Sequence, residues 1–204
     1  LSQKLDYPAP LYYCLMNLLS SHDVPRIRTV LSLGSALEGI SREKAASLKV
    51  SAQQDELGAQ LQSLCAVLQF VLPGFPCVYY GDGLGMQGAS DPFNRGPFMP
   101  GGRSLEQLYA TLGQMRKDNA DILSEGDVRF QPINSDCLCI IRNYGTSELV
   151  AAVNRGDELT VSLHVPGGCT VSPCLLCGQP AQIHFGDLNF VCMHNEAHIF
   201  RVDI

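Results

Sequence analysis

Two loops of the sequence each carry a carboxylate directly after an apolar run. His22 and Asp23 follow the run at residues 11–19, "LYYCLMNLL", and Asp82 follows "PCVYY" at residues 76–80. If both runs are strands of a parallel α/β sheet, these loops lie at the carboxyl ends of the strands, where such proteins bind ligands. A carboxylate and a histidine there supply a charge and a hydrogen-bond donor. Alternatively, the two aspartates only cap turns.

Two helices are expected between and after these runs. Residues 55–72 repeat apolar side chains at steps of three and four, which predicts an amphipathic helix ending at Pro73. The apolar residues are Leu57, Leu61, Leu64, Cys65 and Leu68. A second helix is expected from Ser104, with Gln107 completing a capping box. The resulting order of strand, helix, strand, helix indicates an α/β fold.

The pattern changes after residue 124. Short apolar segments now alternate with Gly, Asn, Asp or Pro every eight to twelve residues, which is typical of an antiparallel β-sandwich. The segments are "GDVRF", "CLCIIRN", "ELVAAVN", "LTVSLHV", "FVCMHN" and "HIFRVD". We therefore predict an α/β domain over residues 1–124 and an all-β domain over residues 125–204.

Composition excludes several classes of function. The net charge is −6 and the Lys and Arg residues are scattered, which argues against a nucleic-acid partner. No apolar run approaches the roughly 18 residues that span a bilayer, so we expect no membrane segment. Nine cysteines without a disulfide framework favour reduced thiols and a cytoplasmic location. Because the sequence starts at Leu1 and not at Met, an upstream signal peptide, and hence secretion, stays open.

A zinc motif is the one rival chemistry in the sequence. Cys174 and Cys177 have C-x2-C spacing, and His194 and His198 have H-x3-H spacing. The two histidines fall in or beside strand segments, however, and not on one face of a helix. We expect two buried strand cysteines and two loop or surface histidines, and therefore predict no metal site and no cofactor.

Three segments resemble the α-amylase superfamily, glycoside hydrolase family 13. "MNLLSSHDVPR" resembles its fourth signature region, and "LPGFPCVYYGDGLGMQGASDPFNR" is similar to the segment around its eighth barrel strand. "QLYATLGQMRKDNADILSEGDV" is similar to its last barrel helix and the exit into the C-terminal domain. The closest group is that of neopullulanase, cyclomaltodextrinase and maltogenic amylase. The resemblance implies that residues 1–124 are the last strands and helices of a (β/α)8 TIM barrel and that residues 125–204 are the C-terminal β-sandwich.

The resemblance also implies roles for single residues. Retaining enzymes of the family use a nucleophilic aspartate, a glutamate acid/base and a third carboxylate that stabilises the transition state. Asp23 matches the third, catalytic carboxylate, and His22 matches a histidine that binds sugar hydroxyl groups. Arg26 and Arg95 are further candidates for substrate contacts or for ion pairs near the cleft, unless they are solvated loop arginines. Asp82 matches a supporting residue.

The nucleophile and the acid/base are expected upstream of Leu1, because the chain resembles the family only from just before the seventh barrel strand. We expect the parent to be a glycosidase that acts on α-linked glucans such as maltodextrins, and this segment alone to be inactive. The alternative is a non-catalytic glucan-binding or assembly module. Partners implied are an α-glucan oligosaccharide and either the missing N-terminal part or a second copy, since part of a barrel leaves open edges.

The chain departs from the family pattern in the second segment. Gly83 stands where the family has a glutamate, and Gln87 replaces a frequent acidic residue. Gly96 and Pro100 replace an arginine and a tryptophan, and the sequence has no Trp at all. These changes remove charge and stacking surface from one side of the expected cleft. They indicate either an unusual substrate or reduced activity.

Overall fold

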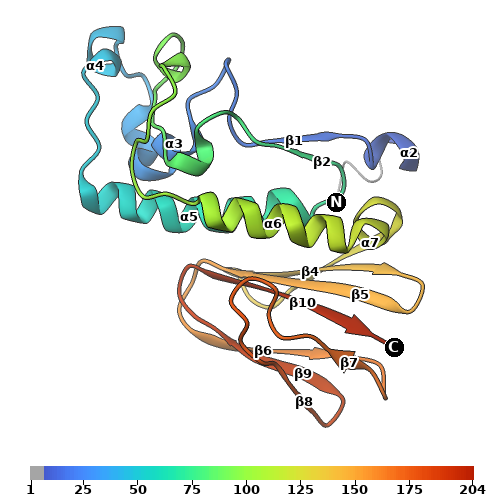
Figure 1. Cartoon of the computed structure of the whole chain (residues 1–204). Helices are drawn as coiled ribbons and strands as arrows, with labels where there is room; N and C mark the ends of the chain where they lie inside the picture. The colour runs from blue at the N-terminus through green and yellow to red at the C-terminus, as the bar shows by residue number, and fades with distance from the viewer. Residues whose placement is uncertain (1–6) are drawn as a thin grey trace.

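The computed structural model describes residues 7–204, which fold in stacked layers (Figure 1). The helices are α2 (Ala9–Tyr12), α3 (Ile27–Leu33), α4 (Arg42–Ala46), α5 (Ala52–Val71), α6 (Glu106–Asp118) and α7 (Ala120–Glu125). The strands are β1 (Met16–Leu18), β2 (Phe75–Cys77), β3 (Asp127–Pro132), β4 (Cys137–Tyr144), β5 (Ser147–Asn154), β6 (Leu159–His164), β7 (Thr170–Val171), β8 (Gln182–His184), β9 (Asp187–Cys192) and β10 (Glu196–Asp203). Helices α5, α6 and α7 lie between the β1–β2 pair and the β-rich half of the molecule. Among residues 7–204, no helix has the length and apolarity needed to cross a membrane.

Helix α5 is the central helix, and its start and end follow from its sequence. Ser51 caps it: the Ser51 hydroxyl accepts a hydrogen bond from the Gln54 N–H, and the Gln54 side chain accepts one from the Ser51 N–H. Its last helical residue is Val71, and Leu72 adopts the extended conformation that a residue before proline prefers. The predicted helix over 55–72 is thus confirmed, three residues longer at its start.

Helix α6 starts differently from the prediction. Ser104 does not form a capping box, because its hydroxyl accepts a hydrogen bond from the Glu106 N–H, two residues on, while the Gln107 side chain donates to Thr111. The helix begins at Glu106, and Leu112 and Met115 on its inner face are buried. The prediction of this helix is therefore confirmed, whereas the predicted capping box at its start is wrong.

Strands β1 and β2 form a parallel pair, with Met16 opposite Phe75. Both strands are shorter than the apolar runs at 11–19 and 76–80, and β1 is not covered on both faces as strands of a parallel sheet usually are. Met16 is 60% exposed and Leu18 is 49% exposed, because β1 pairs only with β2 among the residues described. The run also begins as a helix, since Tyr12 belongs to α2.

A buried glutamine fixes this strand pair on α5. The Gln69 amide donates to the carbonyl oxygens of Asn17 on β1 and Cys77 on β2, both at 2.9 Å. The Asn17 amide in turn donates to the carbonyl of Pro73 at 3.0 Å, just after α5 ends. The direction of both strands is thus set by one face of the central helix.

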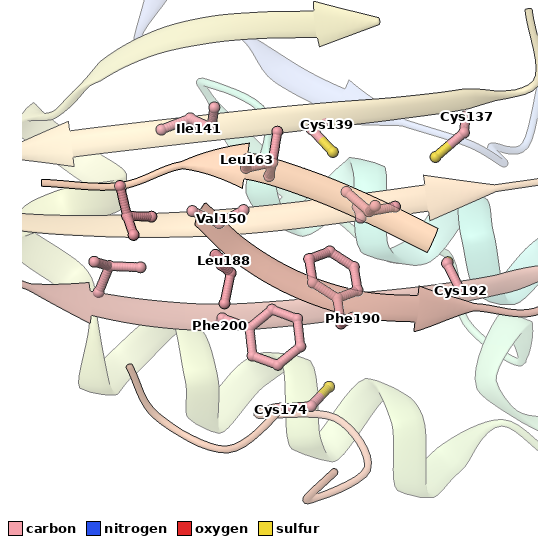
Figure 2. Packing of buried hydrophobic residues seen from close by; sticks show 14 residues of the cluster. Cys137, Cys139, Ile141, Val150, Leu163, Cys174, Leu188, Phe190, Cys192 and Phe200 are labelled. Carbon is pink, nitrogen blue, oxygen red and sulfur yellow. The ribbon is translucent and has the colours of Figure 1, made fainter. Parts of the chain in front are cut away.

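The β-rich half contains two antiparallel sheets. One has the strand order β3-β4-β5-β10-β7 and the other β6-β9-β8. Side chains from both sheets form a common core, which includes Cys139, Val150, Leu163, Phe190 and Phe200 (Figure 2). The strand segments predicted after residue 125 are present, together with two short strands, β7 and β8, that the sequence pattern did not predict.

The five-stranded sheet is covered on both faces. Val150 and Ala152 of β5 point into the core between the sheets, whereas Leu149 and Ala151 pack against α5, α6 and α7. Successive side chains of a strand point to opposite faces, so a strand covered on both sides is apolar at every position. This explains the unbroken "LVAAV" of β5 and the alternating burial of β6.

Arg142 joins the helices to this sheet. Its side chain is fully buried on β4, where Nη1 donates to the carbonyl of Val71 and Nη2 donates to those of Leu123 and Gly126, all at 2.9 Å. These carbonyls lie at the ends of α5 and α7, where helices leave backbone oxygens without partners. Burial lowers the pKa of Arg142 to about 10, so its guanidinium is charged at neutral pH.

We predict that Arg142→Leu destabilises the protein by about 3 kcal/mol or more, because it leaves three buried carbonyls without a donor. The exposed Arg129 of the neighbouring strand is the matched control, and Arg129→Leu should change the free energy of unfolding by less than about 0.5 kcal/mol. Urea unfolding of both variants is the measurement. Equal effects of the two substitutions would contradict this role for Arg142.

Candidate functional site

His22 and Asp23 lie in the loop after β1, where both side chains are open to solvent. Their exposed fractions are 63% and 71%, and His22 Nε2 is 3.2 Å from Asp23 Oδ2. The loop carries them away from the helical layer beneath. A ligand at this surface therefore meets a carboxylate and an imidazole side by side.

Arg95 links this pair to the second loop. Its Nη2 lies 3.8 Å from Asp23 Oδ1, and its Nε donates to the carbonyl of His22 at 3.1 Å. The same Nε is 2.7 Å from Asp91 Oδ1, so one guanidinium touches two carboxylates. Arg95 is half-exposed, and the structure brings it together with both predicted site residues.

Arg26 has a different position. Its side chain is completely buried, with Nη1 donating to the carbonyl of Tyr80 at 2.6 Å. The guanidinium lies over the rings of Tyr79 and Tyr80, at 4.7 and 4.4 Å from their centroids. Such cation–π contacts favour a buried arginine, whose Nε and Nη2 here have no hydrogen-bond acceptor. Arg26 thus supports the loop from below and offers no atom to a ligand at the surface.

Asp82 is the buried partner of Arg26. Its Oδ1 lies 3.7 Å from Arg26 Nη1. Burial raises the pKa of Asp82 to about 6, against the opposing effects of a hydrogen bond with Ser20 and the charge of Arg26. Because it is enclosed beneath the loop, Asp82 cannot face a ligand together with Asp23.

Asn94 fixes the shape of the loop that carries the site. Its side-chain amide is fully buried and donates to the carbonyls of His22 and Val24, each at 2.9 Å, and to that of Ser21 at 3.2 Å. Asn94 is not among the site residues predicted from the sequence. Its signal was present as the polar residue before Arg95 in "DPFNR", but nothing in the sequence showed that its amide points inward.

A second set of contacts holds the base of the site. Arg28 is buried, and it donates to Asp55 at 3.0 Å and to Gln62 at 2.8 Å. Burial opposes ionisation of Asp55, but hydrogen bonds from the Arg103 N–H, Arg28 and Gln87 lower its pKa below the usual value. Gln87, which replaces an acidic residue of the family pattern, donates to Asp55 at 2.8 Å. An acidic side chain here would meet a carboxylate, so the glutamine fits this surrounding.

The cysteine and histidine motif is only partly brought together. Cys174, Cys177 and His198 form one cluster, but His194 lies elsewhere, with Nδ1 2.9 Å from the carbonyl of Gly156. The expectation of two loop or surface histidines is wrong for His198, which is buried in β10. The expectation of two buried strand cysteines is wrong as well, because both cysteines lie after the end of β7 and outside any strand, and only Cys174 is buried.

The electrostatics of this cluster favour a thiolate. Burial opposes ionisation of Cys174, but a hydrogen bond with His198 and backbone N–H groups together lower the pKa of the Cys174 thiol to about 7. The pKa of His198 is raised, since its contacts with Cys174 and Glu196 outweigh its burial.

Comparison with known proteins agrees with the three-segment resemblance. The chain is 34% identical over 171 residues to an amylopullulanase of Thermoanaerobacter thermohydrosulfuricus, a match that covers 77% of this chain and 11% of the relative. It is 32% identical over 179 residues to neopullulanase 2 of Thermoactinomyces vulgaris, covering 83% of this chain and 26% of the relative. No family model matches the chain.

Solved structures give the same result for the fold. The fold superposes on an α-amylase of Anoxybacillus with a TM-score of 0.78 at 21% identity, over 99% of this chain and 40% of that one. The chain thus has the fold of the corresponding part of an α-amylase. The chain belongs to the α-amylase family, glycoside hydrolase family 13, and spans about a tenth to a third of the length of its curated relatives.

We predict that Asn94→Asp destabilises the protein more than Asn94→Ala does. The alanine variant loses the bonds to the loop, at a cost of about 2 kcal/mol. The aspartate variant additionally turns a negative charge toward three carbonyl oxygens, which adds to that cost. Free energies of unfolding at pH 7 are the measurement, with faster amide exchange expected at residues 21–24. Asn143→Ala, at an exposed position, is the control. An aspartate variant as stable as the alanine variant would refute the inward orientation of the amide.

Proposed function

We propose that the chain is the C-terminal part of a retaining glycosidase that acts on α-linked glucans of the maltodextrin type. In this proposal residues 1–124 are the C-terminal portion of a (β/α)8 barrel, of which residues 1–6 lie outside the described part. Residues 125–204 are the C-terminal β-sandwich. The parallel pairing of β1 and β2 across intervening helices supports the first assignment, and the two packed antiparallel sheets support the second.

The observation that carries the proposal is the setting of Asp23. Its carboxylate is exposed after a parallel strand, with His22 beside it and Arg95 behind it. In the proposed role, Asp23 stabilises positive charge that develops on the sugar ring in the transition state, and His22 hydrogen-bonds a sugar hydroxyl group. Arg95 orients Asp23, and Arg26 acts from beneath as a positioning residue.

The two central catalysts belong, in this proposal, to sequence outside these 204 residues. Retaining hydrolysis needs two carboxyl groups about 5 to 5.5 Å apart across the glycosidic bond. Asp82 is enclosed with Arg26, which argues against it as a partner for Asp23. The 204-residue chain alone should therefore not hydrolyse glucans.

Two of the departures from the family pattern occur where space is available. A side chain at Gly96 would meet nothing within 4 Å, and one at Gly83 would make only ordinary contacts with Tyr109 and Glu106. Packing therefore does not require glycine at either position. The loss of charged side chains there supports an altered set of substrate contacts in the parent enzyme.

We predict that Asp23→Asn in the full-length natural protein lowers kcat on maltodextrin by about 10²- to 10³-fold, because the substitution removes the charge and keeps the shape. KM should change little. His22→Ala should mainly raise KM, by about tenfold, through loss of one hydrogen bond. Steady-state kinetics on maltodextrins separates the two effects.

Asp157→Asn, at an exposed turn of the β-rich half, is the matched control and should leave both constants unchanged. Full activity of the Asp23→Asn enzyme would overturn the catalytic assignment. If the full-length protein binds glucan without cleaving it, the chain is instead part of a non-catalytic glucan-binding module. Cleavage by the 204-residue chain itself would show that the main carboxylates lie within it.

The partner proposed for the open strand pair is the remainder of a barrel or, in its absence, a second copy of the chain. Met16, Leu18 and Phe75 are exposed on β1 and β2. Short parallel strands with free edges and apolar side chains are prone to associate. This surface is therefore expected to be covered in the natural protein.

We predict that the isolated 204-residue chain self-associates in a concentration-dependent way. The double variant Leu18→Lys with Phe75→Lys should raise the monomer fraction, because charge opposes burial of the strand pair. Phe185→Lys is the control, since Phe185 is 96% exposed on the β8–β9 turn at the opposite side of the molecule. Sedimentation velocity is the measurement, and a monodisperse wild-type monomer would contradict the prediction.

A further inference from the structure

The turn after β7 carries both cysteines of the C-x2-C spacing. Within "CLLCGQ", the Cys174 N–H donates to the carbonyl of Gln179 at 2.7 Å. Gly178 closes the turn with φ 76°, and its N–H donates to the carbonyl of Cys174 at 2.7 Å. The two cysteines therefore lie in one closed turn, and C-x2-C spacing is a common source of two zinc ligands.

The turn is fixed against β10 on both sides of Cys174. The Leu175 N–H donates to the carbonyl of Ile199 at 2.7 Å, and the Ser172 N–H donates to that of Arg201 at 2.9 Å. Cys174 lies at the edge of the core between the sheets, near Phe190 and Phe200 (Figure 2). Its sulfur thus has a fixed position relative to the strand that carries His198.

His198 completes the cluster. Its Nδ1 lies 3.9 Å from the Cys177 sulfur. Its buried Nε2 lies 3.1 Å from Oε2 of Glu196, within reach of the carboxylate but without the alignment of a hydrogen bond. That same Glu196 oxygen accepts a hydrogen bond from the Met193 N–H at 2.7 Å, so the carboxylate is held in place. Histidine ligands of metals commonly donate their second ring nitrogen to a carboxylate, which orients the first toward the metal.

In contrast to the prediction from the sequence, we propose that Cys174, Cys177 and His198 bind one Zn²⁺ ion, with water as the fourth ligand. The three ligand atoms lie within 4.8 Å of one another. With Zn–S of about 2.3 Å and Zn–N of about 2.0–2.1 Å, two ligands of a tetrahedral ion are about 3.6 Å apart. The observed sulfur to Nδ1 distance of 3.9 Å therefore needs only a small adjustment.

Charge and access also fit zinc. Two thiolates and a neutral imidazole balance the charge of the divalent ion. The complex as a whole is then neutral, which avoids the cost of an unpaired thiolate in a buried position. Thiolate sulfur and imidazole nitrogen favour zinc over calcium or magnesium. Cys177 is exposed, so the ion and a water molecule can reach the site from solvent.

The neighbouring group of Cys192, Glu196 and His198 is a poorer alternative. The Cys192 thiol is fully buried and points to the carbonyl of Glu196 at 3.4 Å. The Glu196 carboxylate is already bound to the Met193 N–H. The proposed ion therefore lies on the Cys174 side of the histidine, where it ties the turn after β7 to β10.

Cobalt substitution tests the site in the intact, natural protein. Wild-type protein, reduced and freed of metal by a chelator, should bind one Co²⁺ per chain with the intense absorption of tetrahedral thiolate coordination, and Zn²⁺ should displace it. Zn²⁺ should also raise the Tm of the metal-free protein. Absence of thiolate-to-cobalt absorption, or a Cys174–Cys177 disulfide in the purified protein that persists after mild reduction, would overturn the proposal.

Variants assign the ligands. Cys177→Ser should abolish the cobalt spectrum, whereas Cys14→Ser, at another exposed cysteine, should keep it. His194→Gln should bind like wild type, although the spacing pattern includes His194. Glu196→Gln should weaken Zn²⁺ binding by about 10- to 100-fold through loss of the support of His198. Wild-type binding by Cys177→Ser, or loss of binding in His194→Gln, would refute the ligand set.

Discussion

The buried guanidinium of Arg142 is the interaction on which the rest of the structure depends. From one strand of the five-stranded sheet it donates hydrogen bonds to the last carbonyls of α5 and α7, and so fixes the ends of both helices against that sheet. Because α5 stops at Val71, Gln69 on its last turn lies opposite both β1 and β2. Because the loop with His22 and Asp23 starts at the end of β1, the position of β1 also fixes the position of this loop. A residue in the β-rich half thus determines, through α5, the position of a loop far away in the sequence.

The loop carrying His22 and Asp23 is held by one buried ion pair and one exposed ion pair. Beneath it, Arg26 and Asp82 are enclosed, and their charges act on each other in a medium that screens them little. At the surface, Arg95 and Asp23 interact in water, where the same type of pair contributes little to stability. The buried pair therefore makes the loop rigid, and the exposed pair leaves the carboxylate of Asp23 available to a ligand.

The sequence predicted those features that depend on local pattern. Alternating or continuous apolar positions identified the main strands after residue 124, and the three- and four-residue repeat identified α5. Long-range contacts could not be predicted. Arg26 and Arg95 look alike in the sequence, yet one is buried under two tyrosines and the other is half-exposed. In the same way, nothing in H-x3-H spacing shows that His198 faces the cysteines and His194 does not, because that depends on how β10 packs.

The five-stranded sheet has a consequence for folding. Alternate residues of β5 belong to two different cores, so Val150 contributes to one and Leu149 to the other. Loss of either core exposes one whole face of the same strands. The two cores are therefore coupled energetically, and neither can melt while the other keeps its native stability. Although one half is α/β and the other all-β, the chain should unfold in one cooperative transition. Limited proteolysis should therefore not yield a stable fragment that consists of one half.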